Sequence, residues 1–173
     1  MKKLCIFICL SFISIFAFSQ WTWQNPLPQG NSLQSVYFTD TNTGYAVGYH
    51  GTIIKTIDGG NTWIVLSSGT IRTLNSVHFA DANTGYAVGE YGTILKTSNG
   101  GYTWIALSGG STGWWESVCF TDSNTGYAVG YHGTIIKTID GGSTWTNLSS
   151  GSTTWLSSVY FPDMYTGYAV GVE

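Results

Sequence analysis

The sequence predicts an all-β protein, a β-propeller made of four-stranded antiparallel blades. The first observation is a repeat: Ser35, Ser76, Ser117 and Ser158 each open a Ser-Val-x-Phe run, 41 residues apart. A fixed period of that size indicates a repeat architecture. The second observation is that every repeat contains short β-patterned segments separated by turn residues. The third is composition, because 23 glycines, 16% aromatic residues and 9% charged residues suit a sheet protein with many tight turns.

The first full repeat shows how each strand is recognised. In residues 35–38, Val36 and Phe38 alternate with Ser35 and Tyr37, so the two pairs are expected on opposite faces of a strand. The next segments are rich in glycine-flanked apolar or β-branched residues, which favour strands. These further strands are expected at residues 45–48, 52–56 and roughly 62–66.

Turn residues separate these strands. Residues 40–44 begin with Asp40 and end with Gly44, a pairing typical of turns, and residues 49–51 and 58–61 are also rich in glycine and polar residues. Such short turns connect antiparallel neighbours into a meander, which cannot bury both of its faces alone. Radial packing of such sheets gives a propeller. A β-solenoid is the alternative, but its coils are usually shorter and the turns favour a meander.

The N-terminus has the pattern of a secretory signal peptide. Lys2 and Lys3 precede an apolar run at residues 4–18, and Ala17-Phe18-Ser19 forms a small-x-small cleavage site. An uncleaved membrane anchor is the alternative, but the run is short for a span of roughly 20 residues. We therefore expect residues 1–19 to be removed and the protein to be exported, whether periplasmic, cell-surface or extracellular, without membrane insertion after cleavage.

Charge and cysteine usage restrict the partners. Without Lys2 and Lys3, the chain keeps four basic residues against nine carboxylates, a formal net charge of −5. No basic stripe exists, which argues against nucleic acid. Cys119 would be the one cysteine left, so no intrachain disulfide is expected. It takes the strand position of Tyr37, and we expect an inert, half-buried thiol.

The turn after the third strand of each repeat carries the motif that identifies a family. Residues 56–63 match the Asp-box, Ser/Thr-x-Asp-x-Gly-x-Thr-Trp, of the bacterial neuraminidase repeat, and residues 97–104 and 138–145 match it again. The matching residues are Thr56, Asp58, Gly60, Thr62 and Trp63, then Thr97, Asn99, Gly101, Thr103 and Trp104, then Thr138, Asp140, Gly142, Thr144 and Trp145. With the preceding Gly-Tyr-Ala-Val-Gly and Gly-Thr-Ile-Ile-Lys-Thr, the pattern resembles the photosystem II assembly and stability factor family.

That resemblance implies an Asp-box propeller, usually seven-bladed, of which many non-photosynthetic bacteria export relatives. It also implies docking of a reaction-centre subunit through an arginine-rich patch. Arg72 is the only arginine here, which argues against a photosystem role.

The repeats divide the chain into blades. Trp23 lies 13 residues before Val36, whereas Trp63 lies 14 before Val77, so the opening resembles the last strand of a blade. The chain is shorter than seven repeats need, so we expect a fragment of a longer protein. A four-blade ring lacking one strand, or an oligomer formed through open blade edges, is the alternative. The expected units are a closing strand at 20–32, blades at 33–73, 74–114 and 115–155, and a partial blade at 156–173.

No catalytic, metal or cofactor site is expected. Asp58 and Asp140 are interpreted as structural acceptors within the turn, since Asn99 keeps an acceptor in the same place without the charge. The resemblance implies an arginine triad for a sialidase, which one arginine cannot form. A glycosidase needs two carboxylates across the scissile bond, and the remaining acids lack periodic partners; these are Glu90, Glu116 and Glu173. His50 and His132 lack a third ligand in register.

The best functional candidate is one end of the blades. The linkers between repeats and the turns at 49–51, 90–92 and 131–133 should emerge together, and their sequences vary. Leu33, Leu74, Trp115 and Leu156 share a register and are expected in the core, whereas Trp114 and Trp155 should be more exposed. Aromatics on variable loops favour recognition of a protein or glycan; the alternative is that both indoles merely cover a blade edge. The candidate residues are Trp114, Trp155, Arg72, Tyr49, His50, Glu90, Tyr91, Tyr131 and His132.

We therefore expect a non-catalytic exported module for binding or assembly. An assembly chaperone like the photosystem II factors is one alternative. The other is a non-catalytic part of an extracellular glycan-processing enzyme.

Overall fold

A computed structural model describes residues 30–108 and 113–172 of the chain. The expected signal peptide at 1–19 and most of the expected closing strand at 20–32 lie outside these residues, as does Glu173. Among the described residues, no helix has the length and apolar character needed to cross a membrane.

The described residues form strands connected by short turns. The strands are β1 (Leu33–Phe38), β2 (Gly44–Gly48), β3 (Ile53–Thr56), β4 (Ile64–Leu66), β5 (Leu74–Phe79), β6 (Gly85–Gly89), β7 (Ile94–Thr97), β8 (Ile105–Ala106), β9 (Trp115–Phe120), β10 (Gly126–Gly130), β11 (Ile135–Thr138), β12 (Thr146–Leu148), β13 (Leu156–Tyr160) and β14 (Tyr168–Gly171). Three single-turn helices connect the second and third strands of the sheets: η1 (Tyr49–Gly51), η2 (Glu90–Gly92) and η3 (Tyr131–Gly133).

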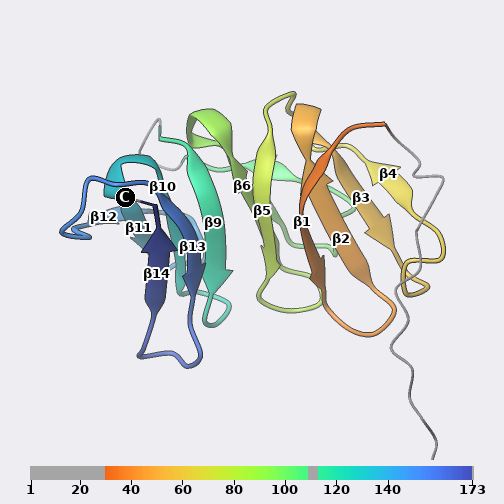
Figure 1. Cartoon of the computed structure of the whole chain (residues 1–173). Coiled ribbons are helices and arrows are strands. Elements are labelled where there is room, and N and C mark those ends of the chain that lie inside the picture. Colours follow the sequence, from red (N-terminus) through yellow and green to blue (C-terminus); the bar gives the residue numbers. More distant parts are fainter. Residues whose placement is uncertain (1–29, 109–112, 173) are drawn as a thin grey trace, which may run out of the picture.

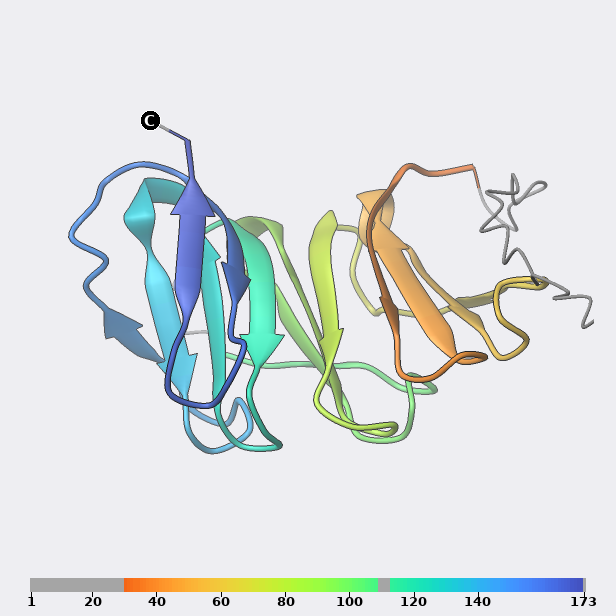
Figure 2. The same cartoon turned by 60° about the horizontal axis from the view of Figure 1, so that its bottom comes forward.

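These strands form successive antiparallel meanders. Three four-stranded sheets have the orders β1-β2-β3-β4, β5-β6-β7-β8 and β9-β10-β11-β12, and β13 pairs with β14. Figure 1 shows the sheets side by side in sequence order, from orange to blue. The first strands β1, β5, β9 and β13 contact one another in series, so the sheets fan out from them as blades (Figure 2). The all-β propeller architecture predicted from the period is confirmed.

The strand limits differ slightly from those expected, for local reasons. Pairing of β1 with β2 continues past Ser35 to Leu33, through an irregularity in the register that brings Leu33 opposite Gly48. The third strand begins at Ile53 rather than Thr52, because the amide of Thr52 donates to the carbonyl of Tyr49 and closes the turn.

The hydrophobic core lies between the sheets. Tyr45 and Val47 of the first sheet pack with Val77 and Phe79 of the second, and the same pattern recurs between the later sheets. Val77 is only 4% exposed, whereas its equivalent Val36 is 61% exposed, because no described sheet packs on that side of β1. The predicted core positions Leu74, Trp115 and Leu156 are buried and Leu33 is half-buried. Neighbouring blades therefore supply each other's second face, as repeat architectures require.

Hydrogen bonds repeat across each sheet interface. The hydroxyl of Ser35 accepts from the amide of Val77 at 3.3 Å. The equivalent bonds join Ser76 to Val118 at 3.3 Å and Ser117 to Val159 at 3.2 Å. These bonds fix the offset of each blade against the next, so the turns at the blade ends are held in register.

Candidate binding face

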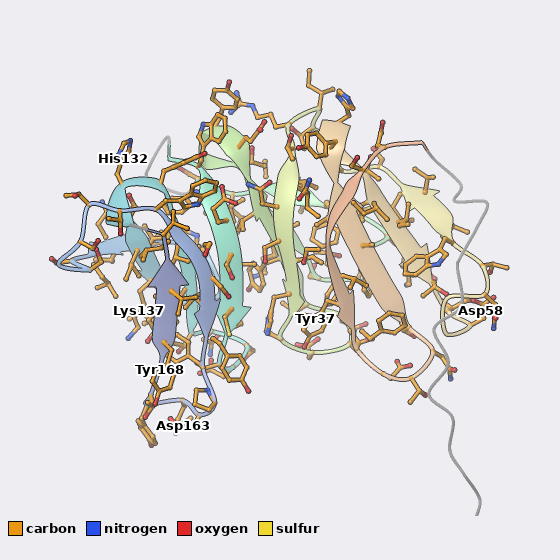
Figure 3. All side chains as sticks on the ribbon, viewed as in Figure 1. Tyr37, Asp58, His132, Lys137, Asp163 and Tyr168 are labelled. Atoms are coloured by element: carbon orange, nitrogen blue, oxygen red, sulfur yellow. The ribbon has the colours of Figure 1, made fainter. Side chains whose placement is uncertain are left out.

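The two ends of the blades carry different turns. On the lower side in Figure 1, the turns between first and second strands bond to those between third and fourth, as when Gly59 donates its amide to the carbonyl of Asn42 at 2.9 Å. On the upper side, the η turns bond to the linkers that precede each first strand, as when Glu90 donates its amide to Thr73 at 3.1 Å. Figure 3 shows His132 at the upper side and Asp163 at the lower side.

The lower side is built from nearly identical acidic turns. In the first, the Asp58 carboxylate accepts from the amide of Thr62 at 2.8 Å, from the Thr62 hydroxyl at 2.7 Å and from the Thr56 hydroxyl at 2.8 Å. Bonds from the side chain and amide of Thr62, then from Thr56, lower the pKa of Asp58. The same bonds in the third sheet, led by those from Thr144, lower the pKa of Asp140 to about 2. Both carboxylates thus act as turn acceptors.

Asn99 performs the same task in the second sheet without a charge. Its side-chain oxygen accepts from the amide of Thr103 and from the hydroxyl of Thr97, both at 3.0 Å. Its amide nitrogen donates to the Thr103 hydroxyl at 2.9 Å. The turn therefore depends on the acceptor and not on acidity.

The tryptophans that close these turns pack against the first strand of their own sheet. Trp63 meets the edge of Phe38 at a centroid separation of 6.3 Å, and Trp104 meets Phe79 at 6.0 Å. Trp145 meets Phe120 in the same way at 6.2 Å. The lower side is scaffold in the three described four-stranded sheets.

The upper side presents one side chain per blade from a strained turn. His50, Tyr91 and His132 have φ of 56°, 54° and 57°, and each precedes a glycine that also has positive φ. Positive φ at both central residues characterises a type I′ hairpin turn. It is unusual for residues other than glycine, asparagine and aspartate, and most of all for a bulky tyrosine. All three side chains are exposed, so the turn directs them into solvent.

Four of the candidate residues continue from Arg72 in an unbroken row of contacts. The Arg72 guanidinium lies over the ring of Tyr91, 4.9 Å from its centroid, and donates to the Tyr91 carbonyl at 2.8 Å. Ring centroids then lie 5.4 Å apart for Tyr91 and Trp114, 5.3 Å for Trp114 and Tyr131, and 4.6 Å for Tyr131 and Trp155. We call Arg72, Tyr91, Trp114, Tyr131 and Trp155 the upper row.

The backbone positions the row. The amide of Tyr131 donates to the carbonyl of Trp114 at 3.1 Å, and the amide of Val172 donates to that of Trp155 at 3.0 Å. Each linker tryptophan is therefore held against the turn side of its own blade. Trp155 is 37% exposed and Trp114 is half-buried between its two tyrosines.

Two glutamates accompany the row. Glu90 occupies in η2 the position that Tyr131 occupies in η3. Glu116 follows Trp115 on β9, and burial, together with the charge of Glu90, raises its pKa. The η2 turn contacts β9, so Glu90 and Glu116 lie on neighbouring elements.

The remaining candidates lie at the same side but outside the row. His50 and Arg72 both line an open hollow of about 640 Å³, which also includes Asn31 and Ile71. Tyr49 is exposed beside His50, and the ring of His132 lies 6.3 Å from that of Tyr131.

The sequence did not predict the hollow or the stacking of Arg72 on Tyr91.

Burial shifts the pKa values of two titratable groups on the inner strands. Burial lowers the pKa of His78 to about 4 and raises that of Cys119. His78 lies between aromatic rings, 4.9 Å from Tyr37 and 6.4 Å from Phe120 by centroids. Among the described residues, no three His, Cys, Asp or Glu side chains are grouped as metal ligands.

Comparison with known proteins places the repeats in a family. The family described as photosynthesis system II assembly factor YCF48 matches residues 14–108. No curated protein matches the chain.

Solved structures give the same indication. A structure of YCF48 bound to D1 peptide is similar with a TM-score of 0.68 and 26% identity, covering 77% of this chain and 44% of that one. YCF48 from Cyanidioschyzon merolae gives 0.63 and 27%, covering 71% and 38%. A GH74 enzyme from Niastella koreensis gives 0.62 and 21%, covering 81% and 28%, a likeness of fold alone. The chain spans less than half the length of these structures.

Proposed function

The chain belongs to the photosynthesis system II assembly factor YCF48 family, and from that premise we propose that it is a non-catalytic, exported propeller module that binds a partner protein through the upper row. The family match confirms the resemblance drawn from the repeat motifs. A protein partner is supported by the structure of YCF48 bound to D1 peptide, which gives protein binding as the family precedent.

The observation that carries the proposal is the continuity of the upper row across three blades. Aromatic side chains dominate the energetics of protein interfaces, because each buries a large rigid surface at low conformational cost. Arg72 extends the same surface by stacking on Tyr91. On the lower side, by contrast, the polar side chains of the acidic turns accept hydrogen bonds from their own backbone, as Asp58 does from the amide of Thr62.

An in-cell crosslinking experiment tests this function. A photoreactive benzoylphenylalanine at Trp155 should crosslink to a discrete partner protein, whereas the same group at Ile139, exposed on the lower side, should not. Trp114→Ala should weaken the crosslink from position 155 while leaving the far-UV circular dichroism unchanged. Equal crosslinks from both positions, or indifference to Trp114→Ala, would contradict the proposal.

Export rests on the N-terminal pattern at residues 1–19. Fractionation of the producing cell should find the protein in the periplasm, on the surface or in the medium, with Gln20 as its first residue. Cytoplasmic protein that keeps Met1 would exclude this part of the proposal.

A glycan is the second candidate ligand, favoured by the exposed indole of Trp155. The propeller would then act as a binding module, or as a non-catalytic part of a glycan-processing enzyme. A glycan array probed with the mature protein distinguishes glycan binding from protein binding, since only a glycan-binding protein would be retained on defined carbohydrates of the array. An assembly chaperone of the YCF48 type, or self-association through open blade edges, would instead crosslink to a client or to a second copy.

A further inference from the structure

The basic side chains of the described blades are already engaged. Lys55 and Lys96 donate to the carbonyls of Gly100 and Gly141 on the lower side, at 2.8 Å and 2.7 Å. Lys137 lies 5.3 Å from the ring centroid of Tyr127. On the upper side, Arg72 is held by both the ring and the carbonyl of Tyr91.

The two acidic side chains of the upper side are not engaged in this way. Within the described chain, neither Glu90 nor Glu116 forms an ion pair with a basic residue, and burial, followed by the charge of Glu90, raises the pKa of Glu116. A positive charge brought from outside would offset that negative charge.

Glu90 lies on the turn whose next residue, Tyr91, contacts an indole. In the third blade, the equivalent Tyr131 lies between Trp114 of its own linker and Trp155 of the next. In the second blade, the amide of Glu90 is bonded to Thr73, and Tyr91, the next residue of the same turn, contacts the ring of Trp114 in the next linker. The η2 turn contacts β9, the strand that carries Glu116. Aromatic faces and carboxylates therefore meet on one surface.

We propose that the upper row receives a basic segment of its partner, with a lysine or arginine side chain lying on the ring of Trp114 and its charge directed to Glu90 and Glu116. This proposal rests on the proposed function and specifies the chemistry of the partner. Aromatic rings attract ammonium and guanidinium groups through their faces, and charge-assisted bonds to carboxylates add direction. The net negative charge of the chain favours approach of a basic segment and disfavours an acidic one.

Fluorescence anisotropy with charged peptides tests the proposal on the mature protein. A fluorescein-labelled hexapeptide of alternating glycine and lysine should bind, and the hexapeptide of alternating glycine and glutamate should not. Glu90→Gln and Glu116→Gln should each weaken binding about two- to fivefold, the upper range of a partly exposed ion pair. Glu90→Tyr, which reproduces the residue of the other two turns, should keep the fold and lose the same affinity.

Asp122→Asn is the matched control. Asp122 accepts from the amides of Asn124 and Thr125 on the lower side at 2.7 Å and 2.8 Å. The asparagine keeps that acceptor and removes the same unit of charge, so binding should be unchanged. Equal weakening by Asp122→Asn would show a net-charge effect and overturn the site, as would equal binding of the two peptides.

The two proposals fail separately. If position 155 crosslinks to a partner but the lysine peptide does not bind, the module binds protein through the row and its preference for a basic segment is wrong. If neither occurs, the upper row is not a protein-binding surface. If a glycan array gives defined hits and the lysine peptide does not bind, the row recognises carbohydrate instead.

Discussion

Lys55, on the third strand of the first blade, donates its ammonium group to the carbonyl of Gly100 in the second blade at a distance of 2.8 Å. The hydroxyl of Tyr45 donates to the same oxygen at 2.9 Å. Lys55 is only 5% exposed, and burial raises the pKa of Tyr45 to about 12. Tyr86 and Lys96 meet Gly141 in the same way. Two donors from one blade thus hold one carbonyl of the next.

This shared acceptor predicts non-additive substitutions. Tyr45→Phe and Lys55→Met should each lower the free energy of unfolding by about 1 kcal/mol, because the other donor keeps the Gly100 carbonyl paired. The double variant should lose more than the sum by roughly 1 kcal/mol or more, since the buried carbonyl is then left without a partner. Urea denaturation of the four proteins measures the coupling.

The third blade supplies the control for that cycle. Tyr127 and Lys137 occupy the same positions, but no glycine carbonyl receives them in the described part of the chain. In a protein made of residues 1–173 alone, Tyr127→Phe and Lys137→Met should therefore be additive. Additive effects in the first blade as well would show that the shared carbonyl contributes nothing to stability.

The acidic turns predict an order of stability that depends on the acceptor. Asp58→Asn should lower the Tm less than Asp58→Ala does, because asparagine keeps the acceptor for the Thr62 amide and alanine removes it. Asn99→Asp should raise the Tm, since a charged acceptor forms a stronger bond. Thermal unfolding followed by circular dichroism gives the order, and equal losses for the two Asp58 variants would contradict it.

Gly85 predicts a steric effect in the second blade. A Cβ at this position would lie 2.6 Å from ring atoms of Phe79, so the ring would have to move out of the core. Gly85→Ala should destabilise the protein by about 1–3 kcal/mol. Gly30→Ala, where nothing lies within 4 Å, should stay within about 0.5 kcal/mol of the parent. Similar losses for both would show that the contact with Phe79 is not the cause.

His78 predicts a loss of stability in mild acid. Burial holds its pKa at about 4, below the ordinary value of 6.5, so the folded protein binds fewer protons than the unfolded chain between these values. The stability is therefore full above pH 6.5 and falls as the pH drops towards 4, by at most about 3 kcal/mol.

The residue of the first repeat supplies the variant that isolates this effect. Tyr37 holds the position of His78 one blade earlier, so His78→Tyr should fold and should lose less stability between pH 7 and 4. His78→Phe should behave alike, since the charge and not the hydroxyl is responsible. Parallel stability curves for parent and variants would contradict the assignment to His78.

Much of the fold was predictable because the same blade pattern occurs in three full repeats of the sequence. The alternation of Val36 with Tyr37 gave the faces of the first strand, and Asn99 in place of Asp58 indicated the structural role of the acidic turn. The repeat period could not predict that Thr52 lies in the preceding turn and not in the third strand. That depends on a local bond to Tyr49 which competes with strand pairing.

The upper row was predictable only as a set of neighbours. Sequence placed Arg72, Tyr91 and Trp114 on one side of the blades. It did not show that the guanidinium lies on the Tyr91 ring, because side-chain torsions decide that contact. The burial of Lys55 was equally hidden, since its acceptor is 45 residues away in the sequence.

The same hydrogen bonds between blades recur from one repeat to the next. Ser35 receives Val77 as Ser76 receives Val118, and Tyr45 reaches Gly100 as Tyr86 reaches Gly141. The first two described interfaces are therefore head-to-tail and chemically alike. A tandem duplication of the codons for one repeat would produce a blade that already fits both of its neighbours. Unequal recombination could therefore add or remove a repeat without requiring a new kind of contact between blades. Single residues of the upper side, such as Glu90, could diverge independently of these contacts.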